Sequence, residues 1–230
     1  MYKLYKSPLI LFISFIASFT SYGQNHYEPN VAVGAKSGYS LSKINFNPSV
    51  PQSMQGGLLA GVTFRYAEEK NFGLIAEFNI EQRGWKEKYE GTSFMFNRRL
   101  TYLQIPVLTH IYFSNQHFKG FFNAGPEVGY MIATKTNANF DYNNITSIPD
   151  FPTQNRYNDQ LTLPIKNRFD YGISAGVGVE WIANRKQSFN FEGRFYYGLS
   201  NVFSSKKADP FSGSNSMSIM ITFGYYYRLK

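Results

Sequence analysis

Bulky apolar residues alternate with small or charged residues in the stretch FDYGISAGVGVEWIA, residues 169–183. One face of this segment carries Phe169, Tyr171, Trp181 and the aliphatic residues between Tyr171 and Trp181, whereas the other carries glycines, Asp170 and Glu180. Alternation with a period of two predicts a β-strand that has one apolar face. Seven further stretches share the pattern, so eight strands are predicted, over 31–41, 56–66, 72–85, 100–113, 118–133, 169–183, 188–200 and 216–229.

The links between the predicted strands alternate strictly between long and short. The long links are 42–55, 86–99, 134–168 and 201–215, and the short links are 67–71, 114–117 and 184–187. Barrels of the outer-membrane type have short periplasmic turns and longer outer loops. The sequence therefore predicts an all-β fold, an eight-stranded antiparallel up-and-down transmembrane β-barrel with both termini in the periplasm.

The polar faces of the strands indicate which side of the barrel is the inside. They combine glycine and serine with charges of both signs, whereas a water-facing surface would be dense in Lys and Glu. Buried charges are tolerated when they are paired, and eight strands enclose just enough room for side chains. We therefore expect a lumen filled by side chains and apolar faces turned to lipid. The predicted lumen charge network comprises Lys36, Arg65, Glu77, Glu81, Arg83, Glu127, Asp170, Glu180, Glu192, Arg194 and Arg228.

Aromatic residues and prolines mark special positions in the predicted strands. Aromatic side chains near the strand ends, among them Trp85 and Trp181, are expected to form girdles at the two membrane interfaces. Pro106 and Pro126 fall inside strands, where each removes a hydrogen-bond donor from the ladder. A bulge or irregular pairing is therefore expected at both prolines.

The N-terminal stretch has the organisation of a secretory signal peptide. Lys3 and Lys6 precede an apolar run over 9–19, which is too short to span a bilayer as a helix. We predict a signal peptide at 1–23 and an outer-membrane β-barrel domain at 24–230. Removal of the two lysines lowers the formal charge from +8 to +6. The chain has no cysteine, which excludes disulfides and thiolate metal sites.

Four short motifs resemble a known family. YLQIPVL at 102–108, NAGPEVGY at 123–130, FDYG at 169–172 and GYSLS at 38–42 are similar to the PorT-like outer-membrane β-barrel family of Bacteroidetes. The resemblance covers nearly all of the predicted mature chain, and it implies an eight-stranded barrel in the outer membrane. It also raises the hypothesis of a PorT-like accessory of a protein-secretion system, a role that membership in the family does not establish by itself.

Candidate catalytic residues are scarce. His110 is the one histidine on the predicted lumen face, and the direction of its strand places it near the periplasmic end, away from the outer rim. Gly172, Gly176 and Gly178 lack the third glycine and the following helix of a dinucleotide-binding loop, so we expect them to make space in a tight lumen. The sequence therefore predicts no enzyme, no cofactor and no metal site.

The predicted outer loops carry an excess of cations. In the 86–99 link Lys86, Lys88, Arg98 and Arg99 outnumber two glutamates, and we expect these four residues to contact lipopolysaccharide phosphates. The expected partners are outer-membrane lipid and lipopolysaccharide, with envelope or secretion-system proteins as further candidates and no nucleic acid.

The predicted function is a non-enzymatic structural or interaction role in the bacterial envelope, at the outer membrane. Three alternatives stay open from the sequence: a PorT-like accessory of a protein-secretion system, a barrel enzyme acting on lipid or peptide, and a small-solute channel.

Overall fold

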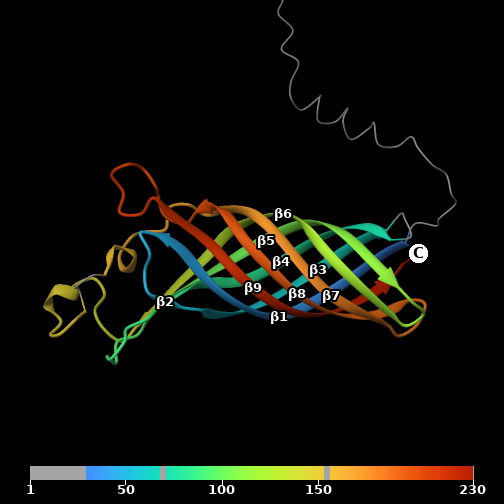
Figure 1. Ribbon diagram of the computed structural model, residues 1–230, viewed down its shortest axis with the longest axis horizontal. Helices are drawn as coiled ribbons and strands as arrows, with labels where there is room; N and C mark the ends of the chain where they lie inside the picture. The colour runs from blue at the N-terminus through green and yellow to red at the C-terminus, as the bar shows by residue number, and fades with distance from the viewer. Residues whose placement is uncertain (1–29, 68–70, 153–155, 230) are drawn as a thin grey trace, which may run out of the picture.

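The computed structural model describes residues 30–67, 71–152 and 156–229, which form one barrel of antiparallel strands (Figure 1). The eight long strands are β1 (Asn30–Asn47), β3 (Gln55–Ala67), β4 (Phe72–Glu87), β5 (Phe96–Ser114), β6 (Phe118–Ala138), β7 (Phe169–Ile182), β8 (Gln187–Asn201) and β9 (Gly213–Arg228). The two-residue strand β2 (Gln52–Ser53) pairs with β4, and two 3-10 helices, η1 (Ile145–Ser147) and η2 (Asp159–Leu161), lie between β6 and β7.

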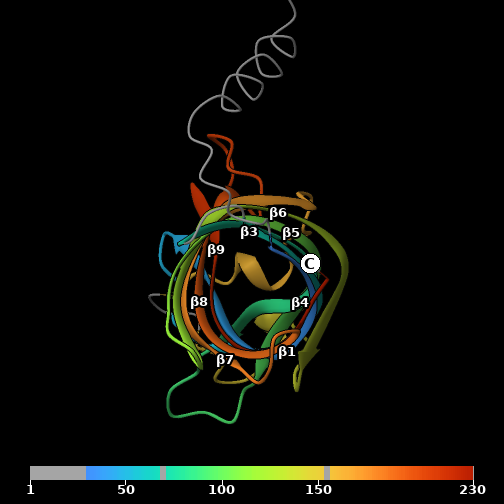
Figure 2. The same cartoon turned by 90° about the vertical axis from the view of Figure 1, so that its right-hand side faces the viewer.

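The ring of strands is closed. Each long strand pairs with the next one in the sequence, and β9 pairs with β1 (Figure 2). The prediction of an all-β, eight-stranded antiparallel barrel is therefore confirmed. Among the described residues, no helix is long and apolar enough to cross a membrane.

The two ends of the barrel differ in their links. Ala32 pairs with Arg228, so the described chain ends lie together at one end, beside the links 68–71, 115–117 and 183–186 (Figure 1). We call this the short-link end. The links 48–54, 88–95, 139–168 and 202–212 lie at the opposite end, the long-link end.

Several strands extend further toward the long-link end than the alternation predicted. β1 continues to Asn47 rather than ending at residue 41, and β6 continues to Ala138 rather than 133. Outward-facing side chains in these extensions are polar, as at Lys43 and Asn45. The apolar alternation therefore stops there, although the backbone ladder continues.

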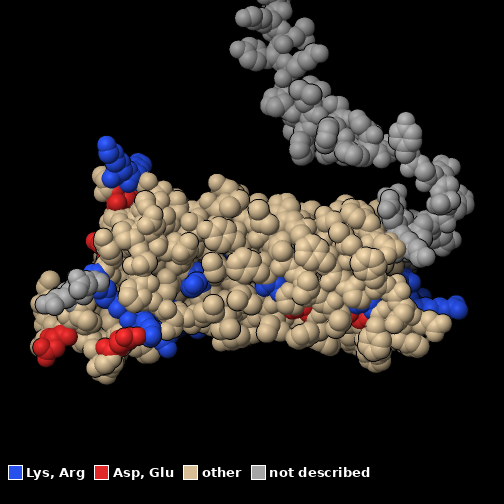
Figure 3. All heavy atoms as spheres, viewed as in Figure 1, with Lys and Arg blue, Asp and Glu red and all other residues tan. Residues whose placement is uncertain are grey.

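Apolar side chains cover the outside of the barrel as a belt. On β7 the outward-facing Val177 and Trp181 are 61% and 49% exposed, whereas Asp170 and Glu180 are buried inside. On the face drawn in Figure 3, most of the surface between the two ends is uncharged, with a few charged atoms visible, and the larger groups of charged side chains lie at the ends. An apolar exterior with a polar interior is the arrangement of a membrane-spanning barrel.

At the long-link end this arrangement inverts. The interior there holds a large aromatic cluster, in which Phe46 meets Trp85 edge to face with ring centroids 5.6 Å apart and stacks on Phe203 at 6.0 Å. We call this cluster the outer cap; it comprises Ile44, Phe46, Val50, Trp85, Tyr89, Phe96, Leu100, Tyr102, Met131, Phe151, Leu161, Val202, Phe203 and Phe211. Apolar residues inside and polar residues outside are typical of a protein surrounded by water. This end of the barrel therefore projects beyond the apolar belt.

Two residue-level expectations change with the structure. The prediction that Trp85 joins an interfacial girdle is wrong: its side chain is fully buried in the outer cap, because its parity along β4 matches that of the inward-pointing Arg83. The expectation of a bulge or irregular pairing at Pro106 and Pro126 is confirmed in part: the ladder between β5 and β6 has a gap beside these prolines, but the register is the same on both sides of the gap. The bulge lies instead between Thr101 and Tyr102.

Candidate functional site

Charged side chains fill the barrel interior in three clusters, of which the first centres on Glu180 of β7 near the short-link end. Arg65 of β3 donates to this carboxylate from Nη1 at 2.6 Å and from Nη2 at 3.0 Å. Ser188 donates to it at 2.6 Å, and Lys119 Nζ lies 3.6 Å away. Because β3 and β7 lie on opposite sides of the ring, the Arg65–Glu180 pair crosses the whole interior.

The second cluster lies in the middle of the barrel and also joins opposite walls. Arg194 of β8 donates to both carboxylate oxygens of Glu77 on β4, at 2.7 and 2.8 Å. Lys36 donates to Glu77 at 2.5 Å, and Arg194 binds Glu192 at 2.8 Å. Asn123 donates to Glu192 at 2.9 Å. Two cations thus face two carboxylates, so the cluster is neutral when all four groups are charged.

The third cluster places one guanidinium among three carboxylates. Arg83 donates to Glu81 at 2.8 Å, to Glu127 at 2.6 Å and to Asp170 at 2.9 Å. The guanidinium carbon also lies 4.0 Å from the ring centroid of Tyr196, a cation–π contact. All three nitrogens of the Arg83 guanidinium therefore donate, each to a different carboxylate. The planar, rigid donor geometry of arginine suits this arrangement.

Neutral donors complete the third cluster. Gln104 donates to Glu81 at 2.6 Å and Ser174 donates to Glu127 at 2.6 Å. The Tyr196 hydroxyl donates to Asp170 at 3.0 Å, and the Ser200 hydroxyl donates to the same carboxylate. A buried carboxylate needs several donors for its lone pairs, and these side chains supply them except at Oε1 of Glu81, which has no hydrogen-bond partner among the described residues.

An ionic contact outside the apolar belt ties the 139–168 link to the outer cap. Arg156 donates to the Glu87 carboxylate and, at 2.7 Å, to the Lys88 carbonyl. Gln160 Nε2 and Trp85 Nε1 each donate to Glu87 at 3.1 Å. Burial raises the pKa of Glu87 above its ordinary value, although Arg156 acts in the opposite direction. These contacts hold the link across the long-link mouth, where the segment around η2 is seen through the ring (Figure 2).

Ten of the eleven residues predicted for the lumen charge network are buried in these clusters. Arg228 is placed differently: it is half-buried at the short-link mouth, and no ion pair joins it among the described residues. Lys119 is absent from the predicted network, although it is buried beside Glu180. Lys119 shares its parity along β6 with Asn123 and Glu127, so strand parity could have identified it.

His110 lies near the short-link end, beside an amide oxygen and two aromatic rings. Its Nδ1 lies 2.7 Å from the amide oxygen of Asn123, and its ring packs against Tyr112 and Phe121 with centroids 5.0 and 5.3 Å away. A general base in a catalytic triad is oriented by a carboxylate and faces a nucleophile. Within the described part of the chain, no group of three or more His, Asp or Glu is arranged to hold a metal ion.

The four residues predicted to contact lipopolysaccharide do not lie together. The prediction is wrong for Arg98, which points inward and donates to the carbonyls of Leu161 at 2.7 Å and Leu163 at 2.8 Å. Arg98 lies in phase with Leu100 and Gln104 along β5, so strand parity could have shown its inward direction; its acceptors, backbone groups of a distant link, could not be predicted. Lys88 is paired with Glu90 at 2.6 Å. Lys86 and Arg99 remain on the outer face of the barrel.

A closed ring of eight strands with an apolar belt and an ion-paired interior defines a transmembrane β-barrel of the outer-membrane class. Residues 22–204 match the family described as outer membrane protein beta-barrel domain. The chain belongs to this family, and its place is the outer membrane.

Two solved structures share the fold. Neisserial surface protein A superimposes with a TM-score of 0.50 and 11% sequence identity, over 87% of this chain and 99% of that chain. The outer membrane protein OprG from Pseudomonas aeruginosa gives a TM-score of 0.50 and 12% identity, over 87% and 95% of the two chains. At these identities the likeness concerns the fold alone. A comparison with curated proteins found no match.

Proposed function

We propose that the protein is a sealed barrel with a non-enzymatic structural or interaction role in the bacterial envelope. The observation that carries this proposal is that two salt bridges cross the interior. Arg65–Glu180 joins β3 to β7, and Arg194–Glu77 joins β8 to β4, each pair of strands lying on opposite walls. A small-solute channel needs a continuous gap between its walls, and direct contact across the barrel closes that gap at both levels.

In the proposed orientation the long-link end faces the outside of the cell and both termini lie in the periplasm. The contrast in link length between the two ends supports this orientation. Residues 1–23, which lie outside the described residues, are then the signal peptide, and 24–230 form the exported chain.

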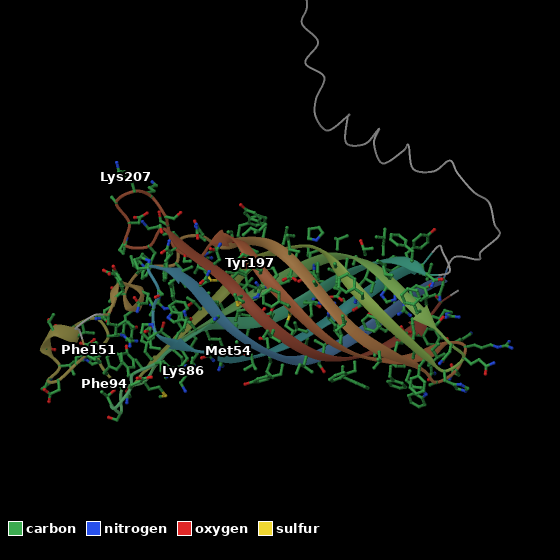
Figure 4. The ribbon with its side chains drawn as sticks, in the orientation of Figure 1. Met54, Lys86, Phe94, Phe151, Tyr197 and Lys207 are labelled. Carbon is green, nitrogen blue, oxygen red and sulfur yellow. The ribbon has the colours of Figure 1, made fainter. Side chains whose placement is uncertain are left out.

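An interaction role would use the outer cap and the links that it holds. Phe94 and Phe151 lie 5.1 Å apart by ring centroid, in the part that projects from the long-link end (Figure 4). This aromatic packing continues through Tyr89 and Phe140. These aromatic contacts hold the links in a fixed arrangement. The links can therefore present a defined surface to another envelope component.

The motifs that resemble the PorT-like family supply residues to the interior. Gln104 binds Glu81, Asn123 binds Glu192, and Glu127 and Asp170 bind Arg83; these four donors and acceptors come from three of the motifs. The motifs therefore favour a shared barrel architecture over a shared secretion activity. A deletion strain tests the accessory role: unchanged export of surface proteins would remove it.

Conductance in planar bilayers tests the sealed barrel. We expect no stepwise conductance from the purified, refolded protein. A variant with Arg65, Glu77, Glu180 and Arg194 all replaced by Ser removes both crossing salt bridges, but Arg83 still meets Tyr196 of the opposite wall and the outer cap still fills the long-link end, so we expect no channel steps from this variant either. Discrete channel steps from the wild-type protein would contradict the proposal.

Hydrolysis assays test the enzyme alternative. We expect the purified protein to release no product from phospholipid, lipopolysaccharide or a peptide mixture. The matched variant is His110→Ala, because His110 is the residue best placed to act as a base. Product release that the wild-type protein shows and this variant lacks would overturn the non-enzymatic assignment.

A further inference from the structure

Charges in the strands are sorted by sign between the two faces of the barrel. Every Asp and Glu in a described strand is buried; these residues are Glu77, Glu81, Glu87, Glu127, Asp170, Glu180 and Glu192. The outward-facing strand charges are all cations and all lie toward the long-link end; they are Lys43, Lys86, Arg99 and Lys135. The wall of the barrel thus offers these outward cations no carboxylate.

Three of these cations form one patch over neighbouring strands. Arg99 of β5 is paired directly with Lys135 of β6, and Lys86 of β4 is paired with Asn97, two residues from Arg99. Side chains directly opposite in a ladder have Cβ atoms about 5 Å apart, and diagonal neighbours are about 7–8 Å apart. We call Lys86, Arg99 and Lys135 the basic patch.

The basic patch has no anion of its own. No salt bridge joins any of its three residues to a carboxylate in the described part of the chain, and the Nε of Arg99 has no hydrogen-bond acceptor. Like charges that face each other directly across a ladder are destabilising. The direct pairing of Arg99 with Lys135 is therefore unfavourable unless an anion from outside the chain lies between or above them.

The basic patch lies where the headgroups of a membrane would meet the barrel. On β5 the outward side chains change from Ile105 and Leu103 through Thr101 to Arg99. With a rise of about 3.3 Å per residue and a strand tilt of about 40°, Arg99 lies about 10 Å beyond Leu103 along the barrel axis. A long cationic side chain can bend back toward the interface, which brings its head group into the phosphate layer.

We propose that the basic patch binds phosphate groups of an anionic lipid in the leaflet at the long-link end. In the proposed orientation, on which this assignment rests, that leaflet faces the outside of the cell, and its anionic lipid is a phosphorylated glycolipid of the lipopolysaccharide type. The planar guanidinium of Arg99 supplies paired donors for phosphate oxygens, and the two lysines add point charges on either side. Lys88 and Arg98 have no part in the site.

Binding of diphosphoryl lipid A to the refolded full chain tests the proposal, read out as retention in native mass spectrometry and as a titrated dissociation constant. The variant is Lys86→Gln, Arg99→Gln and Lys135→Gln combined. The matched control is Lys206→Gln with Lys207→Gln, two exposed cations of the 202–212 link; Lys207 lies at its tip, far from the barrel wall (Figure 4).

Each cation near an anionic surface contributes about fivefold in affinity, so the patch variant should bind on the order of 100-fold more weakly at low salt. The control variant should stay within about twofold of the wild-type protein. Lipid A that lacks both phosphates should bind the wild-type protein as weakly as diphosphoryl lipid A binds the patch variant. Circular dichroism and the migration shift of the unheated protein establish that each variant is folded.

Equal affinity of the patch variant and the wild-type protein would overturn the proposal. Displacement of lipid A by inorganic phosphate at an equal concentration would also overturn it, because the site would then recognise free phosphate. Conductance measured on the same preparations separates the lipid site from the sealed barrel. If the protein conducts but still binds lipid A through the basic patch, only the proposal of a sealed barrel is contradicted.

Discussion

Breaking the Arg65–Glu180 salt bridge from its two sides should cost unequal amounts of stability. Both side chains are almost fully buried, at 4% and 2% exposure, and removal of one partner of a buried pair costs about 3–5 kcal/mol. The change Arg65→Met leaves the Glu180 carboxylate with Lys119 and Ser188 as partners. The change Glu180→Gln leaves two cations, Arg65 and Lys119, without a carboxylate.

The expected free energies follow from these remaining partners. We expect Arg65→Met to lower the free energy of unfolding by about 3 kcal/mol and Glu180→Gln by about 5 kcal/mol. The difference of about 2 kcal/mol corresponds to about a 30-fold change in the unfolding equilibrium constant. In the double variant Arg65→Met with Glu180→Gln, the loss of free energy of unfolding should be smaller than the sum of the two single losses, because only Lys119 is then unpaired.

Urea titrations of the refolded barrel in detergent micelles measure these values, with far-ultraviolet circular dichroism and tryptophan fluorescence as independent probes. Arg228→Met is the matched control, since Arg228 lies half-buried at the short-link mouth without an ion pair among the described residues; we expect a change within about 0.5 kcal/mol. A larger loss for Arg65→Met than for Glu180→Gln, or losses below about 1 kcal/mol for both, would refute the reasoning.

Three further predictions follow from burial, space and charge. In vesicles of brominated lipid, the fluorescence of the exposed Trp181 should be quenched and that of the buried Trp85 should not. Trp181→Phe should therefore abolish the quenching and Trp85→Phe should preserve it. The reverse result would mean that Trp85 faces the lipid. Gly178→Ala should cost about 1–3 kcal/mol in urea titrations, because its new Cβ would lie 2.3 Å from an aromatic ring atom of β6, whereas Gly193→Ala on β8 has open space and serves as its control; equal losses would contradict the close packing. Hydrogen bonds from a serine hydroxyl and a backbone amide of the 202–212 link lower the pKa of Asp209. The ionised carboxylate therefore stabilises this link at pH values above the ordinary aspartate pKa of about 4. The stabilisation is lost as the pH falls through the lowered pKa. After correction for the intrinsic exchange rate, amide hydrogen exchange in the link should become faster on acidification in the wild-type protein and should not change with pH in Asp209→Asn. A measured pKa of Asp209 at or above its ordinary value would contradict this prediction.

The sequence by itself determined the number of strands, their order and the side that each face takes. A period of two needs no partner to be recognised, because successive side chains of one strand point to opposite faces whatever lies beside them. Glycines and charges of both signs on one face then identify the crowded interior. Even a missed residue such as Lys119 obeys this parity, since it lies in phase with Glu127 along β6.

The tertiary structure alone decided which charge meets which, and where the rule of an apolar exterior stops. Arg65 and Glu180 are 115 residues apart, and Arg194 and Glu77 are 117 apart, so closure of the ring rather than local spacing brings them together. Beyond the apolar belt water replaces lipid outside the wall, and the same alternation then carries Trp85 inward and Lys86 outward. Arg98 points inward by the parity of β5, but its acceptors are carbonyls of a link 63 and 65 residues away. Strand parity is local and can be predicted from the sequence, whereas the surrounding solvent and the partner across the barrel exist only in the folded molecule.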